Sequence, residues 1–240
     1  MAITEDSIGA ARVGRGGRPT RAAAAQRDER LLVVAAAMFM ERGFEATTMD
    51  AVAEAAFIGK ATLYARYRDK EALFADVFQR QINRLLAPVE ALTAQASLAD
   101  NVEDTLYHIG HRLLLCALTP EAVAINRILS AQARRFPELA QLAHEGGWNR
   151  SRDAVGEVLS RFAAAGLVHI TEPELAADMF LCLVLGRTTR MAAFNLPLPD
   201  EAALAQRVRF AVRLFLDGVR SSSLASGIKV ERRRLSHSGG

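Results

Sequence analysis

Two cysteines are all that the 240-residue sequence contains, so it cannot hold the disulfide framework of a small secreted domain. Cys116 and Cys182 both lie in apolar helical patterns. We expect buried, unpaired thiols in a reducing cytoplasm, with a disulfide between them as the alternative. The longest apolar runs, residues 31–40 and 179–185, are far shorter than the ~20 residues that span a bilayer, and no signal peptide precedes them. These absences predict a cytoplasmic protein without a membrane partner.

The motifs that usually carry catalysis are also missing. The sequence shows no phosphate-cradling glycine loop, no cysteine set for zinc and no nucleophile paired with a general base. Its seven prolines fall almost entirely at segment edges, and half of its residues are hydrophobic. Helical periodicity continues from about residue 23 to residue 220 without a convincing strand or an internal repeat. We therefore expect an all-α protein that is not an enzyme and needs no cofactor.

The net charge of +3 is unevenly distributed along the chain. Residues 1–27 contain five arginines and two acidic residues, and residues 221–240 contain four basic residues and one acidic residue, so the intervening chain is net negative. We expect residues 1–22 to form a flexible basic arm that enters a DNA minor groove, with a solubilising tail as the alternative. The arginines concerned are Arg15, Arg18 and Arg21. Residues 221–240 are expected to be a disordered basic tail.

Residues 49–70 hold two short helical patterns separated by about three residues. Thr48 is a good N-cap for the first of them. In the second, Leu63 and Tyr67 point inward at positions i and i+4, and the residues that face outward are Lys60, Thr62, Tyr64 and Arg66. Two short helices joined by a tight turn, the second with a basic outer face, predict a helix-turn-helix whose second helix enters the DNA major groove.

A family resemblance covers residues 30–78, because several features occur there in a set order. They are the Phe39 to Gly43-Phe44 spacing, the Thr47-Thr48 cap, Thr62-Leu63-Tyr64, and Tyr67 followed by Asp69-Lys70-Glu71. This stretch resembles the DNA-binding half of a TetR-family repressor. Residues 186–219 resemble the ligand-binding and dimerisation half of the AefR-like branch. The resemblance implies a three-helix helix-turn-helix domain over residues 23–70 and a larger helical ligand-binding and dimerisation domain over residues 71–220.

The resemblance also implies which side chains contact double-stranded DNA. Lys60 can donate hydrogen bonds to guanine, and the Ala61 methyl group can touch a thymine methyl group. The implied contacts are Thr48, Lys60, Ala61, Thr62, Tyr64, Arg66 and Lys70. Phe57 departs from the family pattern, which usually has glycine in the turn, and a positive φ at this residue would cost roughly 1–2 kcal/mol. We predict that Phe57→Gly raises the melting temperature without abolishing DNA binding.

Proline, glycine and helix-capping residues divide the rest of the chain into helices. We expect one helix to run from Asp69, its N-cap, toward Pro88, and a chain break at Gly146-Gly147. The other expected helices cover residues 101–118, 120–135, a short segment from Pro137, 148–165, 171–194 and 200–218. The last two are hydrophobic on too many sides for surface helices, so we expect a homodimer through residues 172–194 and 200–220.

The helices between residues 101 and 194 are expected to enclose a mostly apolar cavity for a small effector. The candidate ligand-binding residues are Tyr107, His108, His111, Arg127, Trp148, Met179 and Cys182. His108 and His111 lie on one helical face with Asp104 one turn earlier, but no further ligand completes a metal site. We predict a repressor released from a near-palindromic operator by a small apolar effector. A regulator without a ligand, an activator, and a small-molecule or metal-binding enzyme that uses His108 and His111 are the alternatives.

Overall fold

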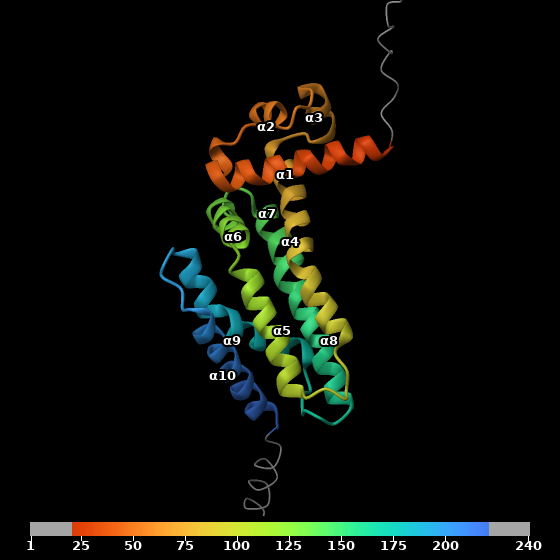
Figure 1. Cartoon of the computed structure of the whole chain (residues 1–240), viewed down its shortest axis with the longest axis vertical. Helices are drawn as coiled ribbons and strands as arrows, with labels where there is room; N and C mark the ends of the chain where they lie inside the picture. Colours follow the sequence, from red (N-terminus) through yellow and green to blue (C-terminus); the bar gives the residue numbers. More distant parts are fainter. Residues whose placement is uncertain (1–20, 221–240) are drawn as a thin grey trace, which may run out of the picture.

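The computed structural model describes residues 21–220, and the side chains of residues 25–219, as a succession of helices without a strand (Figure 1). This confirms the predicted all-α fold. The elements are α1 (Arg21–Ala46), α2 (Met49–Ala55), α3 (Lys60–Arg66), α4 (Lys70–Gln95), α5 (Val102–Ala117), α6 (Pro120–Gln132), α7 (Pro137–Ala143), the π-helical segment η1 (His144–Asn149), α8 (Arg150–Ala164), α9 (Pro173–Ala193) and α10 (Glu201–Arg220). Arg15, Arg18, the 221–240 tail and the side chain of Arg21 lie outside the described part of the chain.

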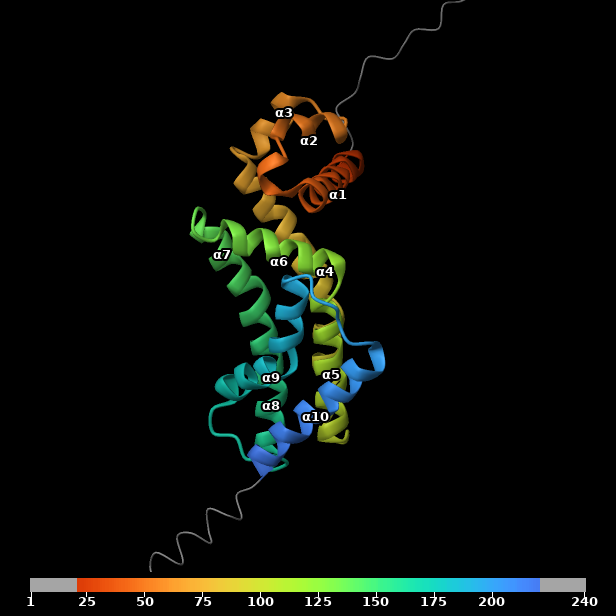
Figure 2. The same cartoon turned by 90° about the vertical axis from the view of Figure 1, so that its left-hand side faces the viewer.

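Two hydrophobic cores follow one another along the long axis of the molecule. Helices α1, α2 and α3 form a cap at one end, and α4 runs from this cap along the bundle (Figure 1 and Figure 2). The upper core joins the cap to the first half of α4 and to three residues of α6 and α7, Ile125, Leu129 and Leu139. The lower core joins the second half of α4 to α5, α8, α9 and α10. Because α4 contributes to both cores, a movement of α4 reaches the cap.

Helix α4 is longer than the sequence pattern predicts. Asp69 caps it as expected, since its Oδ1 accepts a 2.8 Å hydrogen bond from the Ala72 N–H. The pattern places the end of the helix near Pro88, whereas α4 contains Pro88 and ends at Gln95. An internal proline removes one backbone hydrogen bond, but buried side chains lie on both sides of Pro88 and hold the helix together by tertiary packing.

The predicted chain break at Gly146-Gly147 is wrong. Both glycines lie in η1, which joins α7 to α8 without interruption. A Cβ atom added at Gly147 would lie 3.5 Å from Cδ1 of Ile82 on α4, and one added at Gly146 would lie 3.7 Å from Cγ2 of the same residue. Both distances are ordinary van der Waals contacts, so η1 packs against α4 at Ile82, and lack of space does not require glycine at either position.

Both cysteines are free thiols, which excludes the disulfide between them. Cys116 is half-buried and Cys182 is exposed on α9, so the prediction of two buried thiols is wrong. Burial raises the pKa of the Cys116 thiol. The apolar run that contains Cys182 has one face in the lower core and another face outside it. Within residues 21–220 no single helix is long and apolar enough to cross a membrane, although α5 and α6, bent by 67°, meet that test as a pair.

Candidate nucleic-acid interface

Helices α2 and α3 form the predicted helix-turn-helix at the end of the cap. The Thr48 hydroxyl accepts a 3.2 Å hydrogen bond from the Ala51 N–H and so caps α2 as predicted. Leu63 and Tyr67 hold α3 on the upper core, with only 0% and 5% of their surfaces exposed, which confirms the predicted inward pair. The inner face of α3 is therefore fixed, and its exposed residues are Lys60, Ala61, Thr62, Tyr64, Ala65 and Arg66.

An acidic residue of α2 organises two of these exposed side chains. The Lys60 Nζ lies 2.6 Å from Oδ2 of Asp50, and the Tyr64 hydroxyl donates a 3.3 Å hydrogen bond to Oδ1 of the same carboxylate. The hydrogen bond from Lys60 lowers the pKa of Asp50, and the same bond raises the pKa of Lys60. Asp50 was missed in the sequence because it looks like an ordinary first-turn acid. It holds the ammonium and the phenol side by side on the surface that would meet DNA.

Lys70 is the first residue of α4, and its side chain binds the end of α1. Its Nζ donates a 2.7 Å hydrogen bond to the carbonyl oxygen of Phe44 and lies 4.3 Å from the centre of the Phe44 ring. The buried Thr47 hydroxyl donates to the carbonyl oxygen of Gly43 at 2.8 Å, where φ is 80°. These bonds fix the chain just before α2 and leave Lys70 half-buried.

Arg66 joins three helices. Its Nη1 lies 2.5 Å from Oδ1 of Asp28 on α1, and its Nη2 lies 3.7 Å from Oδ2 of Asp76 on α4. The Tyr67 hydroxyl donates a short hydrogen bond to the same Asp76 carboxylate. Burial, together with this bond, raises the pKa of Tyr67 far above its ordinary value. Arg66 thus positions α3 in the protein without DNA, and a contact to DNA would require one of these ion pairs to open.

The turn between α2 and α3 contains a strained residue. Phe57 has a φ of 55°, a left-handed conformation that costs a residue with a side chain roughly 1–2 kcal/mol. Its side chain is 83% exposed, so little burial offsets this cost. The following Gly59, with a φ of −65°, is the N-cap residue of α3 and offers no side-chain cap. The departure from the family pattern at Phe57 therefore does place a residue with a side chain at positive φ.

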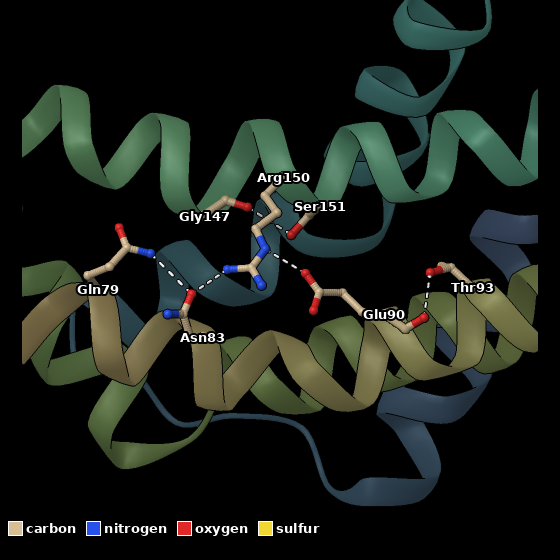
Figure 3. A network of polar contacts seen from close by, with 7 residues as sticks. All are labelled: Gln79, Asn83, Glu90, Thr93, Gly147, Arg150 and Ser151. Atoms are coloured by element: carbon tan, nitrogen blue, oxygen red, sulfur yellow. Dashed lines mark hydrogen bonds and ion pairs between the residues drawn. The ribbon is translucent and has the colours of Figure 1, made fainter. Parts of the chain in front are cut away.

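A polar network joins α4 to the start of α8 (Figure 3). The Arg150 Nε donates a 2.5 Å hydrogen bond to Oε1 of Glu90, and its Nη1 donates to Oδ1 of Asn83. The same Asn83 oxygen accepts a 3.1 Å hydrogen bond from Gln79 Nε2. The Ser151 hydroxyl donates to the Gly147 carbonyl oxygen at 2.9 Å and ties α8 to η1. These hydrogen bonds connect α4 to α8, and α8 to η1.

A cavity of about 380 Å³ lies between α4, α6, η1 and α9, beneath the cap. Phe78 and Ile82 of α4 form part of its wall, and its polar lining residues include Asn126, His144 and Thr189. Among the residues that the structure describes, no Lys, Arg, Asp or Glu lines it. Such a cavity suits a mostly apolar small molecule with a few hydrogen-bonding groups.

Of the seven candidate ligand-binding residues, only Trp148 lines this cavity, and its Nε1 donates a 2.6 Å hydrogen bond to Asp178. The other six lie elsewhere. The Tyr107 and His111 rings stack at 5.4 Å on α5, with His108 exposed beside them. Arg127 donates to the carbonyl oxygens at the end of α9, while Met179 and Cys182 are exposed on α9. In the described residues, no group of three His, Cys, Asp or Glu side chains is placed to hold a metal ion.

Comparisons with known proteins agree with this geometry. Residues 31–77 match the family described as "Bacterial regulatory proteins, tetR family", and residues 104–218 match "AefR-like transcriptional repressor, C-terminal domain". The chain is 33% identical to the HTH-type transcriptional regulator YhgD of Bacillus subtilis over 84 residues, which cover 35% of this chain and 44% of that protein.

Two solved structures match over most of both chains. A TetR-family transcriptional regulator from Mesorhizobium loti is 26% identical, covers 83% of this chain and 98% of its own, and superposes with a TM-score of 0.77. The flavonoid-responsive regulator FrrA is 30% identical, covers 82% of this chain and 99% of its own, and superposes with a TM-score of 0.69. The helix-turn-helix and the helical bundle therefore occur together in these relatives.

Proposed function

Since this chain belongs to the TetR family of DNA-binding transcriptional regulators, which is not a family of enzymes, we propose that it is a ligand-responsive repressor. A homodimer binds a near-palindromic operator, and a small apolar effector in the cavity releases it. The description of the matching C-terminal domain as that of a repressor favours repression over activation.

The observation that carries this proposal is the short path from the cavity to the helix that would read DNA. Phe78 lines the cavity and also belongs to the upper core that supports α3. Helix α4 begins at Lys70, four residues after α3 ends at Arg66. A ligand that displaces Phe78 and Ile82 changes the position of α4 relative to the bundle. In a dimer, this changes the separation of the two α3 helices, which must lie about 34 Å apart to enter successive major grooves.

The exposed faces of α9 and α10 support the homodimer. Leu175 and Met179 on α9 are 53% and 48% exposed, and Phe210 and Leu214 on α10 are 69% and 52% exposed. A row of large apolar side chains on two adjacent helices is a surface that a second copy can bury around a two-fold axis. The same two helices were predicted from the sequence to form the dimer.

The lining of the cavity supports an uncharged effector. A carboxylate or an ammonium group placed there would lose its hydration without gaining an ion pair, because no lining residue in the described part of the chain is Lys, Arg, Asp or Glu. FrrA is described as flavonoid-responsive, so flavonoids are a sensible first set of uncharged probes for this chain. Fatty acids of similar size are the matched carboxylate set.

Fluorescence anisotropy tests the proposal, with the DNA upstream of the protein's own gene as the probe. We expect specific binding whose logarithm falls steeply with the logarithm of salt concentration. A flavonoid that binds should weaken operator affinity, and the operator should weaken flavonoid affinity by the same factor. Equal ligand affinity with and without operator contradicts the effector mechanism, and the absence of specific binding contradicts the DNA-binding role.

A variant separates the cavity from other ligand sites. Val123→Trp fills part of the cavity and should abolish the flavonoid response while the protein still binds DNA. Leu98→Trp is the control, because Leu98 is 53% exposed and is not part of the cavity wall. A response that survives Val123→Trp unchanged places the ligand somewhere else.

A further inference from the structure

Phe57 combines two properties that stability alone does not explain. Its backbone has a φ of 55°, a conformation that glycine adopts without strain, and its ring is 83% exposed. The fold thus has a strained, exposed aromatic residue at a position where glycine would adopt the same backbone conformation at lower energy. Such strain persists at functional sites. We propose that the Phe57 ring packs against a deoxyribose of the DNA backbone, beside the major groove that α3 enters. This proposal rests on the DNA-binding function proposed above.

The surroundings of Phe57 fit a DNA strand. The ring forms one wall of a groove of about 340 Å³ between α1 and the N-terminal end of α3, which Thr62 also lines. Arg27 lines the same groove, and the Arg30 guanidinium carbon lies 6.0 Å from the centre of the Phe57 ring. Both arginines are exposed on α1. Within residues 21–220, the one acidic residue in the groove wall is Asp28, which is already paired with Arg66.

An apolar ring beside two exposed arginines matches the alternation of sugar and phosphate in the DNA backbone. Arg27 and Arg30 would meet phosphates, and the ring would cover the apolar face of the sugar between them. Phe57 lies two residues before the N-cap of α3, so it is at the end of that helix that approaches the bases. The ring adds affinity that does not depend on base sequence, and because it neutralises no phosphate it releases no counterion.

Three substitutions of Phe57 test this proposal in the full-length protein. Phe57→Gly removes both the strain and the ring, and Phe57→Asn removes the ring while keeping a residue that tolerates positive φ. Phe57→Tyr keeps the ring. The probe is a duplex selected by the wild-type protein from a randomised pool, with a scrambled duplex beside it. We expect Gly and Asn to raise the melting temperature by roughly 2–6 °C.

For Phe57→Gly and Phe57→Asn we expect the Kd for both duplexes to rise by about tenfold, because each of the two half-sites loses some tens of Å² of buried apolar surface. Phe57→Tyr should bind within about twofold of wild type. The slope of log Kd against log salt should stay unchanged in all three variants, whereas Arg30→Ala should reduce its magnitude by about 0.9 for each phosphate that the arginine neutralises in the wild-type complex.

Unchanged or tighter DNA binding by Phe57→Gly and Phe57→Asn overturns the proposal. A lower melting temperature shows that the ring serves the fold and also overturns it. A change in subunit stoichiometry, measured by sedimentation, would assign the ring to a protein interface instead. If the wild-type protein selects no duplex at all, the DNA-binding function itself fails, which is a different outcome.

Discussion

Replacing Gly110 with alanine should destabilise the bundle, although alanine is the better helix former. Gly110 is buried in α5, where α9 and α10 cross it. A Cβ atom there would lie 3.1 Å from Cζ of Phe180, 3.3 Å from Cγ2 of Val184 and 3.3 Å from Cγ1 of Val208. All three neighbours are 0% exposed, so none can move into solvent.

The magnitude follows from two opposing effects. Alanine in place of glycine stabilises a helix interior by roughly 1 kcal/mol, while overpacking a close-packed core costs about 1–3 kcal/mol. We expect a net loss of about 1 kcal/mol for Gly110→Ala. Gly156→Ala is the matched control, because Gly156 is also buried in mid-helix. Its added Cβ would meet only ordinary contacts at 3.7–3.9 Å, so this variant should gain up to ~1 kcal/mol.

Urea denaturation followed by circular dichroism measures both changes. With a slope of about 2 kcal/mol per molar urea, the midpoint should fall by roughly 0.5 M for Gly110→Ala and rise for Gly156→Ala. Protein concentration must be equal in all samples, because the proposed dimerisation would add to the apparent stability. A Gly110→Ala variant as stable as wild type would refute the packing argument. Two variants that move in the same direction would refute it as well.

Three further predictions concern the exposed face of α10, the Asp50 carboxylate and the buried Tyr67. Phe210→Glu should weaken dimerisation roughly a hundredfold in sedimentation equilibrium and reduce operator affinity with it, whereas Leu98→Glu should change neither. Asp50→Asn removes the carboxylate that orients Lys60, so binding to a scrambled duplex should tighten in anisotropy while the ratio of specific to non-specific affinity falls. The pKa of Tyr67 is raised in the folded state, so above about pH 10 the unfolded state loses the phenol proton first. The unfolding free energy should therefore fall as pH rises above this value. Tyr67→Phe should remove this part of the pH dependence, as measured by denaturation at several pH values.

Local sequence patterns predicted the parts of the fold that depend on neighbours in the chain. Thr48 and Asp69 were expected to cap α2 and α4, and their side-chain oxygens accept the expected backbone hydrogen bonds. Leu63 and Tyr67 were expected to face inward, and both are buried. A cap is decided within about four residues, and a helix stripe by its period, so one sequence contains enough information for either.

Contacts between distant segments were not predictable in this way. Lys60 and Arg66 look alike on the outer face of α3, yet they pair with Asp50 on α2 and with Asp28 on α1 respectively. The candidate ligand-binding residues on α5, Tyr107, His108 and His111, do not line the cavity beneath the cap. The Tyr107 side chain packs instead under the Arg209 guanidinium of α10, whose carbon lies 4.0 Å from the ring centre. Such pairings depend on how helices pack, which periodicity does not encode.

The π-helical segment η1 makes the bundle unusually sensitive to a deletion. A π-helical turn holds one residue more than an α-helical turn. Loss of any single residue between His144 and Asn149 would let α7 and α8 merge into one regular helix, and α8 would then rotate by about 100° relative to α7. Val155, Leu159 and Phe162 would leave the lower core, and charged neighbours would turn toward it. Length in this segment is therefore constrained more tightly than residue identity.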